Sequence, residues 1–232
     1  MVANLTWTRV VAVTLAVFSA AIAPVSADGI SPSDSAHDYE PPIPGSYALP
    51  VVKPAADGSL LEADGTRVTL RDMTRGRVTV LSFIYTRCAA TKACPFATGV
   101  LNDLHLLSAE DKTLTENMRL VSMSFDPEYD TPERLSAYSQ WARGRKSGCE
   151  WRFATARSRA DLEPILKAYG QAVDKRPNAA DPQGPLYHIL RVYLIDPEGR
   201  IRNIYSSDTL DPRLIVADVK TLVLETARLS KQ

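Results

Sequence analysis

The sequence predicts an α/β fold, with a central mixed sheet that is largely parallel and is covered by helices. The first observation is an apolar run, Val78–Tyr85, whose lack of polar alternation is typical of a strand buried on both faces. A second such run, Met118–Phe125, follows, and each run precedes a segment with helical spacing of apolar residues. Alternating strands and helices favour parallel central strands with helices on both faces. The third observation is a pair of thiols, Cys88 and Cys94, at the corner between the first run and its helix.

A β-hairpin is predicted before the first buried strand. Two turn signals, Asp57-Gly58 and Asp64-Gly65, flank Ser59–Ala63. Leu70–Met73 then forms a short turn that leads into the strand.

The thiol pair is followed by a predicted helix and three further units. The apolar residues of this helix are Phe96, Val100, Leu101, Leu104 and Leu107. After the second strand, Thr131 as N-cap and Pro132 at the first position predict a helix that runs to about Trp141. The rest is predicted as a strand at Trp151–Thr155, a helix from Ser158 to Tyr169 ended by Gly170, a hairpin formed by Leu190–Ile195 and Ile201–Tyr205, and a helix at Leu210–Leu229. A thiol pair at a helix start, with a late hairpin and a closing helix, is typical of a thioredoxin-like fold.

The thiol corner predicts reactive cysteines. Pro95 suits the first helical position, which places Cys94 at the N-cap. Unpaired N–H groups and the positive end of the helix dipole stabilise a thiolate there, so we expect its pKa to lie below the free value of about 8.5. Lys92 and Arg87 add positive charge. Two unrelated core cysteines, or a purely structural disulfide, are the alternatives.

The third cysteine and the other histidines receive weaker predictions. Cys149 follows a basic loop and is expected to be buried at a strand start, with a resolving role for the thiol pair as the alternative. His105 is expected to be a half-exposed helix residue, and His37 a solvated residue of a linker.

The N-terminal part of the chain predicts export. Residues 1–27 have the three parts of a signal peptide, with an apolar run at Val10–Ala23 and a small-x-small cleavage site that ends at Ala27. Residues 28–48 form a Pro-rich linker or a leader lying on the domain, and residues 49–232 form the thioredoxin-like domain. The mature protein is expected in the bacterial periplasm, where the compartment favours disulfides, and an uncleaved membrane anchor is the alternative. The formal net charge of 0 gives no electrostatic case for nucleic acid or an anionic membrane as a partner.

Four stretches of the chain resemble the SCO/SenC family of copper-binding proteins with a thioredoxin fold. The stretches are Phe83–Cys88, Cys94-Pro95, Ser124–Pro132, and His188 ahead of Tyr193–Arg200. Their order and spacing extend the resemblance over roughly Leu49 to Leu224. The usual family motif has three residues between the cysteines, whereas this chain has five, Ala89–Ala93. The longer loop either favours thiol–disulfide chemistry or bulges outward.

The resemblance implies a copper site at Cys88, Cys94 and His188. Two thiolates suit copper(I), and an imidazole nitrogen suits copper(II), so this donor set can serve both oxidation states. Zinc fits less well, because structural zinc sites usually have four protein ligands and the sequence offers no fourth. Tyr85 and Arg87 are expected to flank the thiols. Asp126 and Asp130 either shape the site electrostatically or serve only a turn and a helix start.

Three functions follow from these residues. The first, implied by the resemblance, is a metallochaperone that delivers copper to the dinuclear copper centre of cytochrome c oxidase or keeps the thiols of that centre reduced. Its partners would be the copper ion and the oxidase subunit that carries this centre, or another copper protein. The second is a thiol–disulfide oxidoreductase in which Cys88 and Cys94 are the catalytic redox pair, and the third is a copper or redox sensor.

Overall fold

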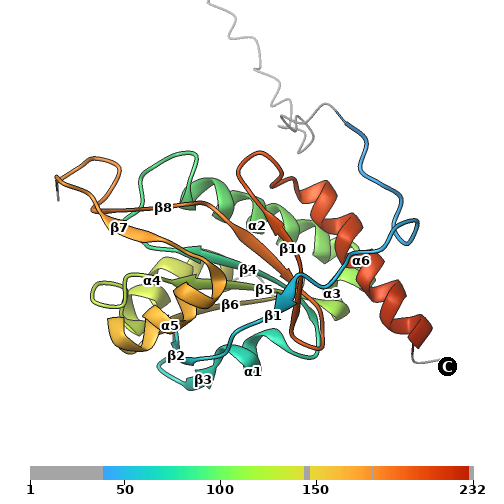
Figure 1. The fold of residues 1–232 in the computed structure, drawn as a ribbon, viewed down its shortest axis with the longest axis horizontal. Coiled ribbons are helices and arrows are strands. Elements are labelled where there is room, and N and C mark those ends of the chain that lie inside the picture. The colour runs from blue at the N-terminus through green and yellow to red at the C-terminus, as the bar shows by residue number, and fades with distance from the viewer. Residues whose placement is uncertain (1–38, 144–146, 179, 230–232) are drawn as a thin grey trace, which may run out of the picture. The chain divides into compact units, whose positions relative to one another are not determined.

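The computed structural model describes residues 39–143, 147–178 and 180–229, which form an eight-stranded sheet, a two-stranded ribbon and flanking helices (Figure 1). The strands are β1 (Lys53–Pro54), β2 (Ser59–Glu62), β3 (Arg67–Thr69), β4 (Val78–Ile84), β5 (Met118–Ser124), β6 (Glu150–Ala156), β7 (Val173–Lys175), β8 (Leu186–His188), β9 (Val192–Ile195) and β10 (Arg200–Tyr205). The helices are α1 (Leu70–Thr74), α2 (Cys94–Glu110), α3 (Lys112–Asn117), α4 (Pro132–Arg143), α5 (Arg159–Tyr169) and α6 (Pro212–Leu229).

The large sheet is mixed, and its strand order is β1-β10-β9-β4-β5-β6-β2-β3. The expected α/β architecture and both hairpins, β2–β3 and β9–β10, are confirmed. The parallel part is smaller than the alternating pattern indicates, since only β4, β5 and β6 are parallel. The physical reason lies after α5, where the chain makes the β7–β8 ribbon and enters β9 without a crossover helix, antiparallel to β4.

The core is divided by the sheet into two clusters, because successive side chains of a strand point to opposite faces. On β4, Val78 and Val80 face one cluster, whereas Leu81 and Phe83 face the other. The first cluster includes buried residues of α2, α3, α4 and α6, and the second includes those of α1 and α5. All seven residues of β4 are buried, as the lack of polar alternation in this run predicts.

Helix ends follow the expected capping signals in two cases and differ in one. Ser158 caps α5 by accepting from the backbone N–H of Asp161, and Gly170 ends it with φ of 67°. The hydroxyl of Thr131 accepts from the backbone N–H of Arg134 at 3.4 Å at the start of α4. The expected N-cap of α2 is wrong by one residue, because Ala93 is the N-cap and Cys94 is already helical. Proline tolerates either of the first two positions, so it could not fix the start to one residue.

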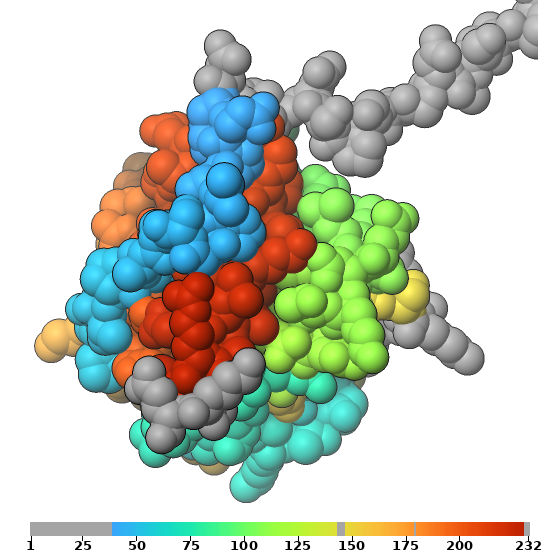
Figure 2. All heavy atoms as spheres, turned by 90° about the vertical axis from the view of Figure 1, so that its right-hand side faces the viewer, coloured from blue at the N-terminus to red at the C-terminus, as the bar shows by residue number. Residues whose placement is uncertain are grey.

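The expected signal peptide and the linker up to residue 38 lie outside the described residues. The rest of the linker runs along α6, as Figure 2 shows for the blue segment beside the red helix. Tyr47 donates to the Asp218 carboxylate at 2.6 Å, and Tyr205 and Asn203 donate to its other oxygen at 2.7 and 2.9 Å. This part of the leader therefore packs on the domain. No described helix is both long and apolar enough to cross a membrane.

Replacing Tyr47 with Phe should lower the free energy of unfolding by about 1 kcal/mol, because a buried Asp218 oxygen loses its donor. Urea denaturation measures this loss. Tyr187→Phe is the matched control, since no hydrogen bond joins the Tyr187 hydroxyl to another described residue. Equal stability of the wild type and Tyr47→Phe would show that the leader is not held by this contact.

Candidate functional site

The two thiols lie at the end of β4, where the chain turns into α2. The backbone N–H of Cys88 donates to the Tyr85 carbonyl at 3.1 Å, which closes a turn directly after the strand. A second turn, from Ala93 N–H to the Ala90 carbonyl at 2.9 Å, leads into the helix. Cys94 is 2% exposed and Cys88 is half-buried. Both are free thiols in the structure.

The five-residue loop between the thiols lies at the surface, where Ala89, Thr91 and Lys92 are exposed. One contact joins it to the loop before β8, from Ala89 N–H to the Gln183 carbonyl at 3.2 Å. The extra residues therefore bulge outward, which is one of the two expectations for the longer loop.

His188 is brought to the thiols by contacts of the strand that carries it. The buried Tyr85 hydroxyl donates to the Leu186 carbonyl at 2.7 Å, two residues before the histidine. The loop can pass this close because Gly184 has φ of 101°, and a Cβ there would meet the Tyr85 hydroxyl oxygen at 2.4 Å. The imidazole packs on the Phe125 ring with centroids 4.5 Å apart. Its Nε2 atom ends 3.3 Å from the Cys94 sulfur.

The His188 ring is neutral, and one tautomer suits its contacts. Burial lowers its pKa to about 4. Its Nδ1 atom lies 3.2 Å from the Ile189 carbonyl oxygen, which can only accept, so Nδ1 carries the proton. The Nε2 lone pair therefore faces Cys94. A backbone carbonyl on Nδ1 is the usual way in which proteins orient a histidine whose other nitrogen serves as a ligand.

The thiols differ in acidity, and the assignment is opposite to the expected one. A side-chain hydrogen bond from Cys94 lowers the pKa of Cys88 to about 6, helped by the backbone N–H groups of Cys94 and Ala90. The pKa of Cys94 is raised, first by its hydrogen bond to Cys88 and then by burial. The helix N-terminus does stabilise a thiolate, but the thiolate belongs to the loop residue Cys88. The sequence could not show this, because the hydrogen bond between the thiols and the deeper burial of Cys94 arise only in the folded chain.

Acidic residues after β5 fix the loop of the thiols, and neither contacts a sulfur. The buried Asp130 carboxylate accepts from the Thr86 backbone N–H at 3.0 Å and from the Ser124 hydroxyl at 2.6 Å. Asp126 accepts from Arg87 at 2.6 Å. The Arg87 guanidinium also stacks on the Tyr129 ring, 3.9 Å from its centroid. Tyr85 and Arg87 thus hold the loop, Asp126 acts through the Arg87 side chain, and Asp130 acts through the Thr86 backbone.

The third cysteine lies away from this site. Cys149 is 2% exposed, directly before β6, and burial raises its pKa. Its backbone N–H donates to the Ser108 hydroxyl near the end of α2 at 2.8 Å. Ser108 and Cys94 lie near opposite ends of α2, and a rise of 1.5 Å per residue puts them about 20 Å apart along the helix axis. Cys149 is therefore too distant to resolve a disulfide at the pair. The expectation for His105 is wrong, because it is 4% exposed and lies against Trp151.

The three predicted ligands adjoin one another in a chain: Cys94 contacts both Cys88 and His188. They do not enclose one point. Among the described residues, no group of three His, Cys, Asp or Glu side chains stands ready to hold a metal ion. The site thus has a buried central thiol with an acidic thiol on one side and a neutral imidazole on the other.

Several contributors to this site could not be found from the sequence. The ring of Phe125 and the carbonyls of Leu186 and Ile189 act through their positions, which only the folded chain determines. Gly184, between polar residues and a proline, was the one available signal of a tight turn.

The comparisons with known proteins agree on one family. A family model described as SCO1/SenC matches residues 55–224. The chain belongs to this family. It is 30% identical over 161 residues to the SCO1 protein homolog of Bacillus subtilis (strain 168), an overlap that covers 68% of this chain and 77% of that protein.

Solved structures of the family share this architecture. BsSco, a member of the Sco family of cytochrome c oxidase assembly proteins in which a disulfide switch was identified, is 25% identical with a TM-score of 0.58, over 74% of this chain and 95% of that one. Arabidopsis thaliana ScoI with copper bound is 22% identical with a TM-score of 0.56, over 74% of this chain and 98% of that one. The thioredoxin-like fold expected from the order of elements is confirmed.

The pKa difference between the thiols predicts a pH profile for alkylation. The Cys88 thiolate is present above a pH of about 6 and is lost as the pH falls through that value. We expect the rate of iodoacetamide reaction with the reduced protein, divided by the intrinsic rate of a thiolate, to be half-maximal near pH 6. Peptide mapping by mass spectrometry should assign the label to Cys88.

Cys94→Ala is the informative variant, because it removes the hydrogen bond that lowers the pKa most. Its profile should shift to higher pH, whereas Cys149→Ser should keep the wild-type profile. A midpoint near 8.5, the value of a free thiol, in the wild-type protein would contradict the assignment.

Proposed function

We propose that this protein is a Sco-type copper carrier, which holds one copper ion with Cys88, Cys94 and His188. The observation that carries the proposal is the contact of the His188 Nε2 atom with the Cys94 sulfur at 3.3 Å, across 94 residues of sequence. A neutral imidazole aimed at a thiol pair has no evident use in a purely structural core. The copper-bound relative from Arabidopsis thaliana supports the choice of metal.

The donor chemistry fits copper in both oxidation states. Thiolates prefer copper(I), and the imidazole adds a nitrogen donor that copper(II) requires. Cys88 is already acidic, and His188 is neutral at pH 7 with its Nε2 lone pair available. Cys94 must lose its proton, which a bound cation would drive. Metal uptake should therefore release protons.

The arrangement supports a site that closes when metal is bound. Cys88 is half-buried on a surface loop, whereas Cys94 is buried in a helix and His188 is held by ring packing. A carrier has to release its cargo, and a partly exposed outer ligand provides a route for exchange with a partner.

The client that best fits the family is the copper centre of cytochrome c oxidase. BsSco is described as a member of a family of oxidase assembly proteins, which supports this choice. We propose that the chain is exported through the segment 1–27 and works in the periplasm, held at the membrane if that segment is not cleaved.

Copper binding tests the proposal directly. The reduced protein from residue 28 onward, loaded anaerobically with copper(I) and desalted, should retain one copper per chain. Cys88→Ser, Cys94→Ser and His188→Ala should each lose tight retention, because two donors hold a soft cation less well than three. Cys149→Ser is the matched control and should bind as the wild type does. Full retention by His188→Ala would refute the three-ligand site.

A thiol–disulfide oxidoreductase is the second candidate function. The unequal acidity of the two thiols favours it, since an acidic, half-buried Cys88 can attack and the protonated Cys94 can resolve. His188→Ala separates the two functions, because it should remove copper retention and spare disulfide exchange. A protein that cycles between dithiol and disulfide but retains no copper would favour this second function.

A further inference from the structure

A charged pocket of about 410 Å³ opens beside the thiol site. It shares three residues with the supports described above: Arg87, which precedes Cys88, Asp126, which pairs with Arg87, and Leu186, which accepts from Tyr85. Its charged lining comes from the loop after β4, the loop after β5, the start of α5 and the β7–β8 ribbon. These side chains are Arg87, Asp126, Glu128, Arg159, Lys175 and Arg176.

The lining of this pocket is basic. Four cationic and two anionic side chains give it a formal charge of +2, whereas the whole chain has a formal charge of 0. Asp126 is paired with Arg87 at 2.6 Å, which leaves the exposed Glu128 as the second acidic group. Positive charge concentrated in a concave surface raises the local concentration of anionic partners.

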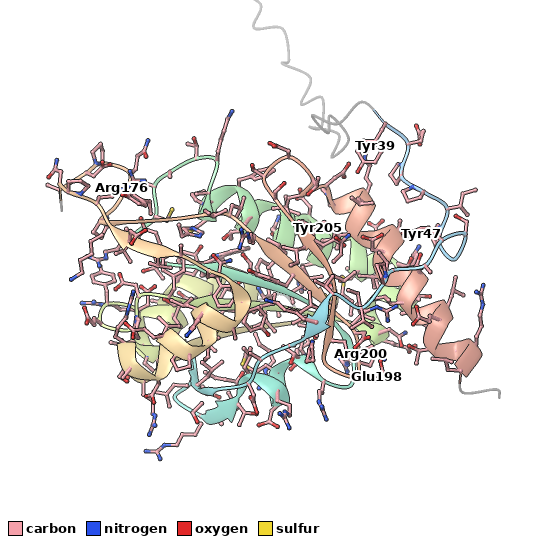
Figure 3. The ribbon with its side chains drawn as sticks, viewed as in Figure 1. Tyr39, Tyr47, Arg176, Glu198, Arg200 and Tyr205 are labelled. Carbon is pink, nitrogen blue, oxygen red and sulfur yellow. The ribbon has the colours of Figure 1, made fainter. Side chains whose placement is uncertain are left out.

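Two of the arginines are held in place. Arg87 is fixed by Asp126 and by the Tyr129 ring. The Nε atom of Arg176 donates to the Leu186 carbonyl at 3.3 Å, and its guanidinium lies 3.7 Å from Asp181 and over the Tyr187 ring. Figure 3 places Arg176 at the loop end of the β7–β8 ribbon. Fixed guanidinium groups suit the planar carboxylates of acidic side chains.

The other two cationic side chains of the lining make weaker contacts. Lys175 is exposed, and no ion pair joins it to any other residue in the described ranges. Arg159 makes a 3.5 Å pair with Glu163 on the surface of α5, a contact of little energetic value. Both can therefore turn toward an incoming anionic group.

We infer that this pocket is a docking site for an acidic segment of a protein partner. This partner is the one that exchanges copper with Cys88 and Cys94 or undergoes thiol–disulfide exchange with them. The inference rests on the proposed function for the existence of such an exchange. The basis of the inference is the excess positive charge of the lining and the position of the pocket next to both Cys88 and the strand of His188. Docking there would hold a partner's donor atoms near the half-buried thiol for the duration of the exchange.

A matched pair of peptides tests this inference on the full mature chain. One has the sequence Glu-Glu-Cys-Glu-Glu and the other Gln-Gln-Cys-Gln-Gln, each with its cysteine as a mixed disulfide with 2-thiopyridine. The Cys88 thiolate attacks the peptide sulfur, a new disulfide forms between Cys88 and the peptide, and the old sulfur–sulfur bond breaks. Its electron pair leaves on the pyridine-2-thiolate, whose ring nitrogen takes a proton from water to give the thione, which is followed by its ultraviolet absorbance. The leaving group is the same for both peptides.

The acidic peptide should react with the wild type about tenfold faster than the neutral one at low salt. This advantage should approach unity at about 0.5 M salt, where screening is strong. Arg159→Gln combined with Lys175→Gln should remove most of it, and neither residue touches a thiol. The matched control is Arg67→Gln combined with Lys112→Gln, which deletes the same charges on β3 and α3 and should keep the advantage.

Equal rates of the two peptides with the wild type would overturn the inference, as would an advantage that survives in the pocket variant. An equal loss in both double variants would show a general charge effect and overturn it as well. Failure of both peptides to react at Cys88 would have the same meaning, since the pocket is proposed to serve that thiol.

Copper loading of the same proteins separates this inference from the proposed function. A wild type that retains copper without preferring the acidic peptide would defeat only the docking site. A wild type that prefers the acidic peptide but retains no copper would defeat the copper carrier and leave docking for disulfide exchange.

Discussion

The site depends on one hydrogen bond, from the Tyr85 hydroxyl to the Leu186 carbonyl. It joins the end of β4 to a strand 101 residues later in the chain. Because Tyr85 is 1% exposed, water does not compete for its hydroxyl, and the bond is satisfied within the protein. The bond brings β8, and with it His188, over the start of α2. A glycine at position 184 leaves room for this approach.

The hydrogen bond between the two thiols gives them different acidities, and the deeper burial of Cys94 adds to the difference. Cys94 lies behind the loop, against the imidazole, and keeps its proton, whereas Cys88 lies in front and faces the N–H groups at the helix start. A reactive outer thiol with a protected inner thiol serves both functions considered above. In a copper carrier the outer thiolate can meet the partner first, and in an oxidoreductase it can attack first.

Five residues separate the two cysteines at the site of this SCO1/SenC protein. The structure accommodates the extra residues in an exposed turn, so that the loop lengthens outward and Cys88 still reaches Cys94. The lengthened loop adds exposed surface at the same end of the molecule as the basic pocket. Variation in this region would therefore alter the contact with a partner more than the ligand set.

The sequence by itself determined the order of most elements. Runs without polar alternation such as Val78–Tyr85 favour a strand covered on both faces, and turn and capping residues such as Ser158 and Gly170 act locally. Local rules could not fix the first residue of α2 or the burial of His105. The resemblance to the family marked Cys88, Cys94 and His188 as candidate ligands.

Only the tertiary structure decided which thiol is acidic, how His188 is oriented and where positive charge collects. Each depends on residues that are distant in sequence. The orientation of His188 depends on contacts with Ile189 and Cys94, and the positive charge comes from residues such as Arg87 and Lys175, which line one pocket. Desolvation and electrostatic fields act through space, and the distances that set them arise only when the sheet has assembled.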